Sequence, residues 1–228
     1  MPESGIGAIF DWDGVIIDSS SHHEKSWERL AAETGYVLPQ DYFKKGFGMK
    51  NAFIIPRLLK WTETPEDVHR LSLRKEELYR EIVVEHGIAP LPGVMKWLDE
   101  LKRYGIPCAI GSSTERRNID TILDVLGFGH YFSAVVSAED VSHGKPDPEV
   151  FLIAAQHIGQ NPSHCVVFED ALVGIEAAHR GGMKAVGVAT TNPIELLGAA
   201  DLAVHRLDEL SIEKLTALIR PGSQPRDI

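Results

Sequence analysis

The sequence has few cysteines, no long hydrophobic run and no excess of positive charge. Its two cysteines, Cys108 and Cys165, lie in short apolar stretches, which is typical of buried reduced thiols and not of a disulfide framework. No stretch approaches the roughly 20 consecutive apolar residues of a membrane-spanning helix. The first residues also lack the basic and apolar stretches of a signal peptide. We therefore expect a cytoplasmic protein with no membrane partner.

The charge balance is acidic, with 33 acidic and 23 basic residues and a net charge of −10 over 228 residues. Proteins that bind nucleic acids present basic faces to the phosphate backbone, so this balance disfavours a nucleic-acid partner. A small phosphorylated substrate remains compatible, because a few lysines and a metal ion can make one cleft locally positive. The length suits one substantial core with a small accessory domain, and we expect a monomer or a weak homodimer.

Strand and helix patterns alternate along most of the chain. Short apolar stretches predict strands at 6–10, 106–110, 134–136, 165–168, 184–188 and, more weakly, 202–204. Helical patterns lie between them, at 94–103, 115–126, 148–158, 171–180 and, as a short piece, 194–199. Such alternation is typical of a parallel sheet with helices on both faces, and it predicts a doubly wound, Rossmann-like α/β core.

The stretch from 21 to 85 differs, because its apolar residues recur at helical spacing and it contains no convincing strand. It follows the first strand directly, so it is an insertion into the α/β pattern. We expect a core domain of residues 1–18 and 91–228 and a helical cap domain of residues 19–90.

Polar side chains gather where the predicted strands end, and ligands of parallel sheets bind at the carboxyl ends of the strands. Asp11 and Asp13 follow the first strand, and a lysine lies in the loop before the helix at 148–158. The full set is Asp11, Asp13, Ser112, Ser113, Lys145, Glu169 and Asp170.

Crowded carboxylates repel one another, so they require a cation. An all-oxygen site suits Mg²⁺, which retains waters and binds substrate phosphate. The ion and Lys145 together would neutralise a phosphoryl group while one carboxylate attacks phosphorus, an established use of aspartate.

The order and spacing of these side chains resemble the four motifs of the haloacid dehalogenase-like phosphatase superfamily. The motifs are Asp11-Trp12-Asp13-Gly14-Val15, Ser112, Lys145 and Glu169-Asp170. The helical insertion resembles the four-helix-bundle cap of one subfamily, and the chain is most similar to the β-phosphoglucomutase-like branch. The resemblance spans nearly the whole chain.

This resemblance implies catalytic roles for three residues. Asp11 would be the nucleophile, Asp13 the general acid and base, and Lys145 the group that balances charge between nucleophile and phosphoryl group. Ser112 and Ser113 would hold the phosphoryl oxygens.

The same resemblance implies a Mg²⁺ site. Asp11 and Asp170 would be ligands through their carboxylates, Asp13 through its backbone carbonyl, and Glu169 would lie in or next to the ligand sphere.

In the cap, the resemblance implies substrate-binding roles for His23, Lys50, Asn51 and Lys75. The sequence departs from the β-phosphoglucomutases at Asn51, where those enzymes carry an arginine for a second phosphate. Lys50 lies one residue away but lacks the bidentate fork of arginine. The inorganic pyrophosphatases of this branch carry a cap glutamate where this chain has Phe47, which disfavours that activity too.

We therefore expect a Mg²⁺-dependent phosphatase that hydrolyses a small phosphorylated metabolite, a sugar phosphate in particular, through an aspartyl-phosphate. The alternative is a phosphomutase of the β-phosphoglucomutase type. A signalling receiver also combines a phospho-accepting aspartate, a hydroxyl and a lysine on a parallel sheet. It has no need of a proton carrier such as Asp13 or of a substrate lid, and both features disfavour it.

Overall fold

The computed structural model describes residues 5–46 and 48–219. The chain divides into two compact units, one formed by Met1–Asp18 with Ala89–Ile228 and the other by Ser19–Ile88. Below, the first is called the core unit and the second the cap unit. Phe47, and with it the expectation about pyrophosphatase activity, lies outside the described residues. No helix among the described residues has the length and apolar character needed to cross a membrane.

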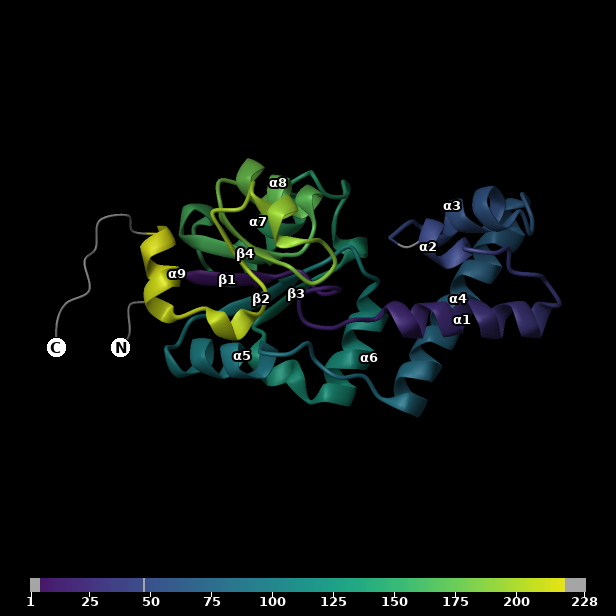
Figure 1. The fold of residues 1–228 in the computed structure, drawn as a ribbon, viewed down its shortest axis with the longest axis horizontal. Helices are drawn as coiled ribbons and strands as arrows, with labels where there is room; N and C mark the ends of the chain where they lie inside the picture. The colour runs from purple at the N-terminus through teal and green to yellow at the C-terminus, as the bar shows by residue number, and fades with distance from the viewer. Residues whose placement is uncertain (1–4, 47, 220–228) are drawn as a thin grey trace. The chain divides into compact units, whose positions relative to one another are not determined.

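The core unit is built on a six-stranded parallel sheet (Figure 1), in the order β3-β2-β1-β4-β5-β6. The chain leaves the central strand β1 toward β2 and β3 and then returns to β4 on its other side. This reversal places a topological switch point between β1 and β4, where ligands of such sheets bind. The strands are β1 (Gly7–Phe10), β2 (Cys108–Gly111), β3 (Ala134–Val136), β4 (Cys165–Glu169), β5 (Lys184–Val188) and β6 (Leu202–Val204).

Helices cover both faces of this sheet (Figure 1), as the doubly wound fold requires. The helices are α5 (Val94–Arg103), α6 (Arg116–Leu126), α7 (Glu149–His157), α8 (Leu172–Arg180) and α9 (Ile212–Ile219). Short 3₁₀ helices, η2 to η6, span Phe128–Tyr131, Ala138–Asp140, Pro162–His164, Ile194–Leu197 and Leu207–Glu209.

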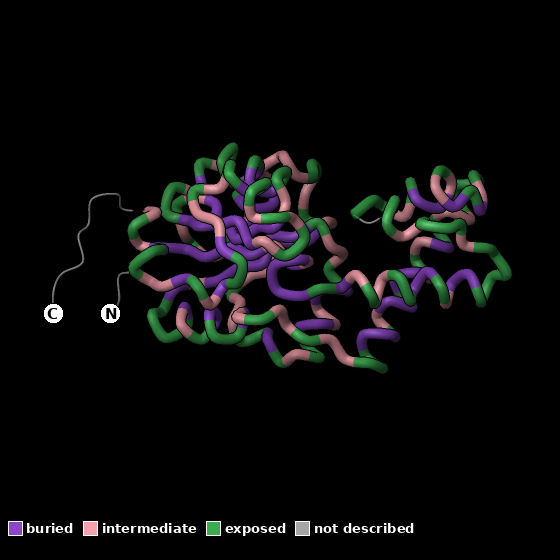
Figure 2. Tube along the Cα trace, in the orientation of Figure 1, coloured by how far each residue is buried: buried purple, intermediate pink, exposed green. Residues whose placement is uncertain are grey.

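Successive strand residues point to opposite faces of the sheet, and both faces are apolar. Ile9 and Val167 pack with Phe151 of α7 and with apolar residues of α8 in one cluster. Phe168, next along β4, stacks on Phe10 with ring centroids 4.5 Å apart and meets Trp97 of α5 on the other face. Figure 2 shows the strands buried at the centre of this unit.

Both cysteines are buried and unpaired, in agreement with the sequence prediction. Burial raises the pKa of the Cys108 thiol to about 12 and that of Cys165 to about 11, because a thiolate is poorly solvated in an apolar interior.

The cap unit contains two long helices, α1 (Ser20–Thr34) and α4 (Pro65–His86), which pack on each other. Its apolar centre includes Trp27 and Leu30 of α1 and Leu71 of α4. Its described residues contain no strand. The resemblance implied a four-helix bundle, and the cap unit has three short helical segments between its two long helices. These segments are α2 (Tyr42–Gly46), α3 (Asn51–Phe53) and the π-helix η1 (Ile54–Leu59).

Candidate active site

Three carboxylates meet at the carboxyl ends of β1 and β4. Asp11 follows β1, Glu169 ends β4 and Asp170 comes next, and the Asp11 amide donates to the Phe168 carbonyl at 3.0 Å. One oxygen of each carboxylate lies within 4.8 Å of the other two, so these side chains could hold a metal ion. Three of the four predicted metal residues therefore supply converging carboxylates. The fourth, Asp13, was predicted to bind through its backbone carbonyl.

Lys145 bridges two of these acids. Its Nζ lies 2.8 Å from Asp11 Oδ1 and 2.7 Å from Glu169 Oε1, and its side chain is only 7% exposed. Burial alone would lower the pKa of this amine, but the two carboxylates outweigh burial and raise the pKa above its usual value. The group is therefore an ammonium ion fixed beside the Asp11 carboxylate.

The ionised forms of Glu169 and Asp170 are disfavoured where these side chains lie. Burial is the main cause that raises the pKa of Glu169 and of Asp170 above the usual range, and repulsion by the Asp11 carboxylate adds to it. A divalent cation among them would favour their ionised forms. The chemistry of the donor set therefore fits Mg²⁺, which binds carboxylate oxygens.

Two glycines make room for these acids. Gly14 has a φ of 78°, and a Cβ there would lie 2.2 Å from Asp170 Oδ2. A Cβ at Gly174 would lie 1.7 Å from Glu169 Oε1. Gly14 belongs to the first sequence motif, whereas no motif includes Gly174. Gly174 lies inside the helix predicted at 171–180. Glycine weakens a helix, so its presence there indicates a packing constraint.

Asp13 is not one of the three converging carboxylates, and it has a hydroxyl partner of its own. Its Oδ2 accepts a hydrogen bond from Thr114 Oγ1 at 2.6 Å, and the amide of the next residue, Gly14, donates to Ile17 at 2.8 Å. The hydroxyl partner Thr114 was missed by the sequence analysis. Thr114 lies shortly after the end of the predicted strand at 106–110, so its position along the chain could have identified it as a candidate site residue.

Ser112 and Ser113 both follow β2, but they differ in exposure. Ser112 is buried, and its Oγ accepts a hydrogen bond from the Thr114 amide at 3.1 Å. Ser113 is exposed. The structure thus places both at the expected strand end, next to the residue that contacts Asp13.

Three predicted cap residues come together in a second polar cluster, which lies within the cap unit. Lys75 Nζ is 2.6 Å from His23 Nδ1 and 2.9 Å from Glu76 Oε1, and Asn51 Nδ2 donates to the same Glu76 oxygen at 2.7 Å. Glu76 was not predicted, although it neighbours Lys75. Lys50 is exposed and makes none of these contacts.

The charges of this cap cluster cancel. Burial and the adjacent Lys75 ammonium lower the pKa of His23 to about 3, so its ring is neutral near pH 7. Burial works against the Glu76 carboxylate, but Lys75 and His23 outweigh it and lower its pKa to about 2. Near pH 7 the cluster therefore contains the Lys75 ammonium, the Glu76 carboxylate and a neutral His23 ring, and its net charge is zero.

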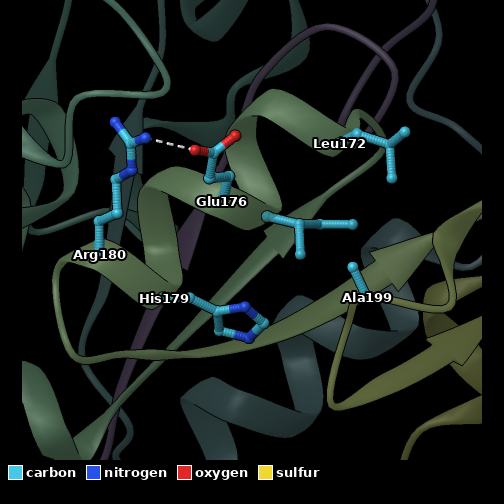
Figure 3. A pocket seen from close by; sticks show the side chains of 6 residues that line it. Leu172, Glu176, His179, Arg180 and Ala199 are labelled. Carbon is cyan, nitrogen blue, oxygen red and sulfur yellow. Dashed lines mark ion pairs between the residues drawn. The ribbon is translucent and has the colours of Figure 1, made fainter.

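A surface cavity of about 540 Å³ lies elsewhere on the core unit, beside α8. Figure 3 shows Glu176 and Arg180 paired across one side of it, with His179 and Ala199 at the other. None of the predicted site residues lines this cavity, so it is separate from the converging carboxylates.

Comparison with known proteins gives a consistent result. A family model described as haloacid dehalogenase-like hydrolase matches residues 7–182. The chain is 41% identical over 216 residues to the chloroplastic 5-amino-6-(5-phospho-D-ribitylamino)uracil phosphatase of Arabidopsis thaliana, covering 93% of this chain and 57% of that protein. It is 36% identical to the fructose-1-phosphate phosphatase YqaB of Escherichia coli (strain K12), covering 82% and 98%. The crystal structure of a β-phosphoglucomutase from Clostridium difficile superposes with a TM-score of 0.77 at 28% identity, covering 93% and 96%.

Proposed function

The chain belongs to the haloacid dehalogenase-like hydrolase family, and from this premise we propose that it is a Mg²⁺-dependent phosphatase whose nucleophile is the carboxylate of Asp11. The observation that carries the proposal is the contact of Lys145 with Asp11 at 2.8 Å, inside a cluster of three carboxylates. This arrangement supplies a nucleophile, a fixed positive charge and a place for a divalent ion.

In the first step, Asp11 attacks phosphorus and the bond from phosphorus to the leaving oxygen breaks. Asp13 donates a proton to that oxygen, so the alcohol leaves neutral. The Lys145 ammonium offsets the negative charge gathered between the Asp11 carboxylate and the phosphoryl group. When bound, Mg²⁺ would supply further charge neutralisation at the phosphoryl oxygens, held by Asp11, Asp170 and the Asp13 carbonyl.

In the second step, Asp13 takes a proton from water, and the water oxygen attacks phosphorus. The bond from phosphorus to Asp11 breaks, which releases phosphate and restores the carboxylate. Thr114 supports both steps by holding one Asp13 oxygen at 2.6 Å, which orients the carboxyl group.

For the substrate we propose a sugar phosphate or sugar-alcohol phosphate. The names of the two phosphatases reported above describe phosphate esters on the terminal carbon of a polyhydroxyl chain.

The phosphomutase alternative is favoured by the similarity to the Clostridium difficile enzyme. A mutase must hold a second phosphate group while the first is transferred. Asn51 stands where the resemblance to the β-phosphoglucomutases places an arginine for that phosphate, and its amide donates to Glu76 at 2.7 Å. An uncharged amide at this position favours hydrolysis over the mutase reaction.

The test is a screen of phosphorylated metabolites with Mg²⁺ present, measured by released phosphate. We expect Asp11→Asn to lose turnover while keeping the fold, because an amide cannot attack phosphorus. Asp124→Asn, at an exposed position on α6, is the matched control and should keep full activity. Normal hydrolysis by the Asp11→Asn variant would refute the proposed nucleophile.

A product assay separates the two candidates. β-Glucose 1-phosphate is incubated with the enzyme, with and without a bisphosphate primer. Released phosphate supports the hydrolase, and isomerised sugar phosphate supports the mutase.

A further inference from the structure

The segment that follows β5 reaches back to the carboxylate cluster through three consecutive side chains, none of which the sequence analysis singled out. Thr191 Oγ1 donates to Asp170 Oδ2, and Asn192 Nδ2 donates to the Asp170 backbone carbonyl at 2.9 Å. Thr190 Oγ1 donates to the carbonyl of Gly14. One short segment thus holds both the Asp170 side chain and the turn that follows Asp11.

This segment is itself attached to the sheet. The Ala189 amide donates to the Val204 carbonyl of β6 at 2.8 Å, and the Thr190 amide donates to the Val188 carbonyl at 2.9 Å. The hydroxyl of Thr191 is therefore presented from a backbone that β5 and β6 fix.

Asp170 Oδ2 is confined on two sides. Gly14 approaches so closely that a Cβ there would lie 2.2 Å from this oxygen, and the Thr191 hydroxyl bonds to it. With Oδ2 held in this way, rotation of the Asp170 carboxylate is restricted.

We propose that Thr191 is a positioning residue for the metal site: its hydrogen bond to Oδ2 fixes the orientation of the Asp170 carboxylate, which would hold the ion. Asn192 assists by fixing the Asp170 backbone. The inference rests on the proposed function, since it assigns Thr191 a part in the Mg²⁺ site on which that function depends. Residues that orient metal ligands typically change metal affinity about 10- to 100-fold when removed.

The experiment measures Mg²⁺ binding by calorimetry on the substrate-free full chain. Thr191→Val keeps the size of the side chain but removes the hydroxyl, and we expect Mg²⁺ to bind about 10- to 100-fold more weakly to it. Thr191→Ser keeps the hydroxyl and should bind Mg²⁺ as the wild-type chain does. Thr121→Val, which removes a hydroxyl bonded only within its own helix, is the matched control and should leave binding unchanged.

A second readout separates positioning from a general structural defect. If Thr191 acts through the ion, the phosphatase activity of Thr191→Val should return at saturating Mg²⁺, and its unfolding temperature without Mg²⁺ should match that of Thr121→Val. A loss of activity that excess Mg²⁺ does not restore would overturn the inference.

The outcomes also distinguish this inference from the proposed function. Normal Mg²⁺ affinity in Thr191→Val, beside a wild-type chain that binds Mg²⁺ and hydrolyses phosphate esters, would overturn the inference alone. A wild-type chain that takes up no Mg²⁺ would overturn both.

Discussion

Single atoms decide the geometry of this site, and Gly174 is the clearest case. A methyl group there would lie 1.7 Å from Glu169 Oε1, and Glu169 is held by Lys145 at 2.7 Å. Its other oxygen accepts a hydrogen bond from the Ala171 amide at 2.8 Å, so a shift of the glutamate would break one or both of these contacts. The need for a glycine in the first turn of α8 is thus a consequence of the buried acid beside it.

We predict that Gly174→Ala displaces Glu169, lowers the phosphatase activity and destabilises the core by about 1–3 kcal/mol, as overpacked sites do. The measurements are urea unfolding and phosphate release. Gly129→Ala is the control, because a Cβ there meets no atom within 4 Å. Equal stability and activity for the two variants would show that the close approach has no energetic effect.

At the scale of elements, the buried cap cluster joins three helices of the cap unit. His23 comes from α1, Asn51 from α3, and Lys75 with Glu76 from α4. The His23 ring also stacks on Tyr79, with centroids 4.0 Å apart. A histidine that is neutral near pH 7 therefore takes part in the packing of α1 against α4.

This neutrality gives the cap a pH dependence whose sign follows from linkage. The folded pKa of His23, about 3, lies below its ordinary value of 6.5, so the unfolded chain takes up a proton that the folded chain excludes. The stability contributed by His23 is complete above pH 6.5 and is lost as the pH falls from 6.5 toward 3. Glu76, whose pKa is lowered from 4.5 to about 2, loses its contribution only between those lower values.

We predict that the free energy of unfolding of the cap falls between pH 6.5 and 4.5 by up to about 1.4 kcal/mol per pH unit, the value for one proton. His23→Gln should flatten this slope, because glutamine takes up no proton in this range. His69→Gln, at an exposed position on α4, is the control. Hydrogen exchange of the α1 and α4 amides across this pH range measures the effect, and an unchanged slope in His23→Gln would contradict it.

Elements differ in how well the sequence predicted them. Helix 94–103 and strand 134–136 have the predicted bounds, because apolar spacing and flanking turn residues agree there. Helix α9 (Ile212–Ile219) was not predicted. It has eight residues, of which Leu215 is buried, so its apolar pattern is short and weak.

For the whole molecule, a net charge of −10 makes the carboxylate cluster part of a generally acidic protein. The cluster contains one ammonium, Lys145, for the acids Asp11, Glu169 and Asp170. A bound divalent ion would remove the remaining repulsion, so its binding should stabilise the folded state.

We predict that Mg²⁺ raises the unfolding temperature and that a chelator lowers it and abolishes phosphate release. A ligand at 100 times its Kd adds about 2.7 kcal/mol to the free energy of unfolding. Sodium chloride at equal ionic strength is the control for screening. Equal stabilisation by both salts, or full activity in the chelator, would contradict a specific Mg²⁺ site.

The sequence by itself determined the alternation of strands and helices and the identity of the acids, because periodicity and strand-end position are properties of the chain. Only the tertiary structure decided which groups touch. It paired Glu76 with Lys75 and Asn51, and it brought Thr191 to Asp170 across 21 residues. Contacts of this kind depend on where the folded backbone places each side chain, and no local pattern encodes them. The same reason explains Gly174, whose role exists only because Glu169 is packed against it.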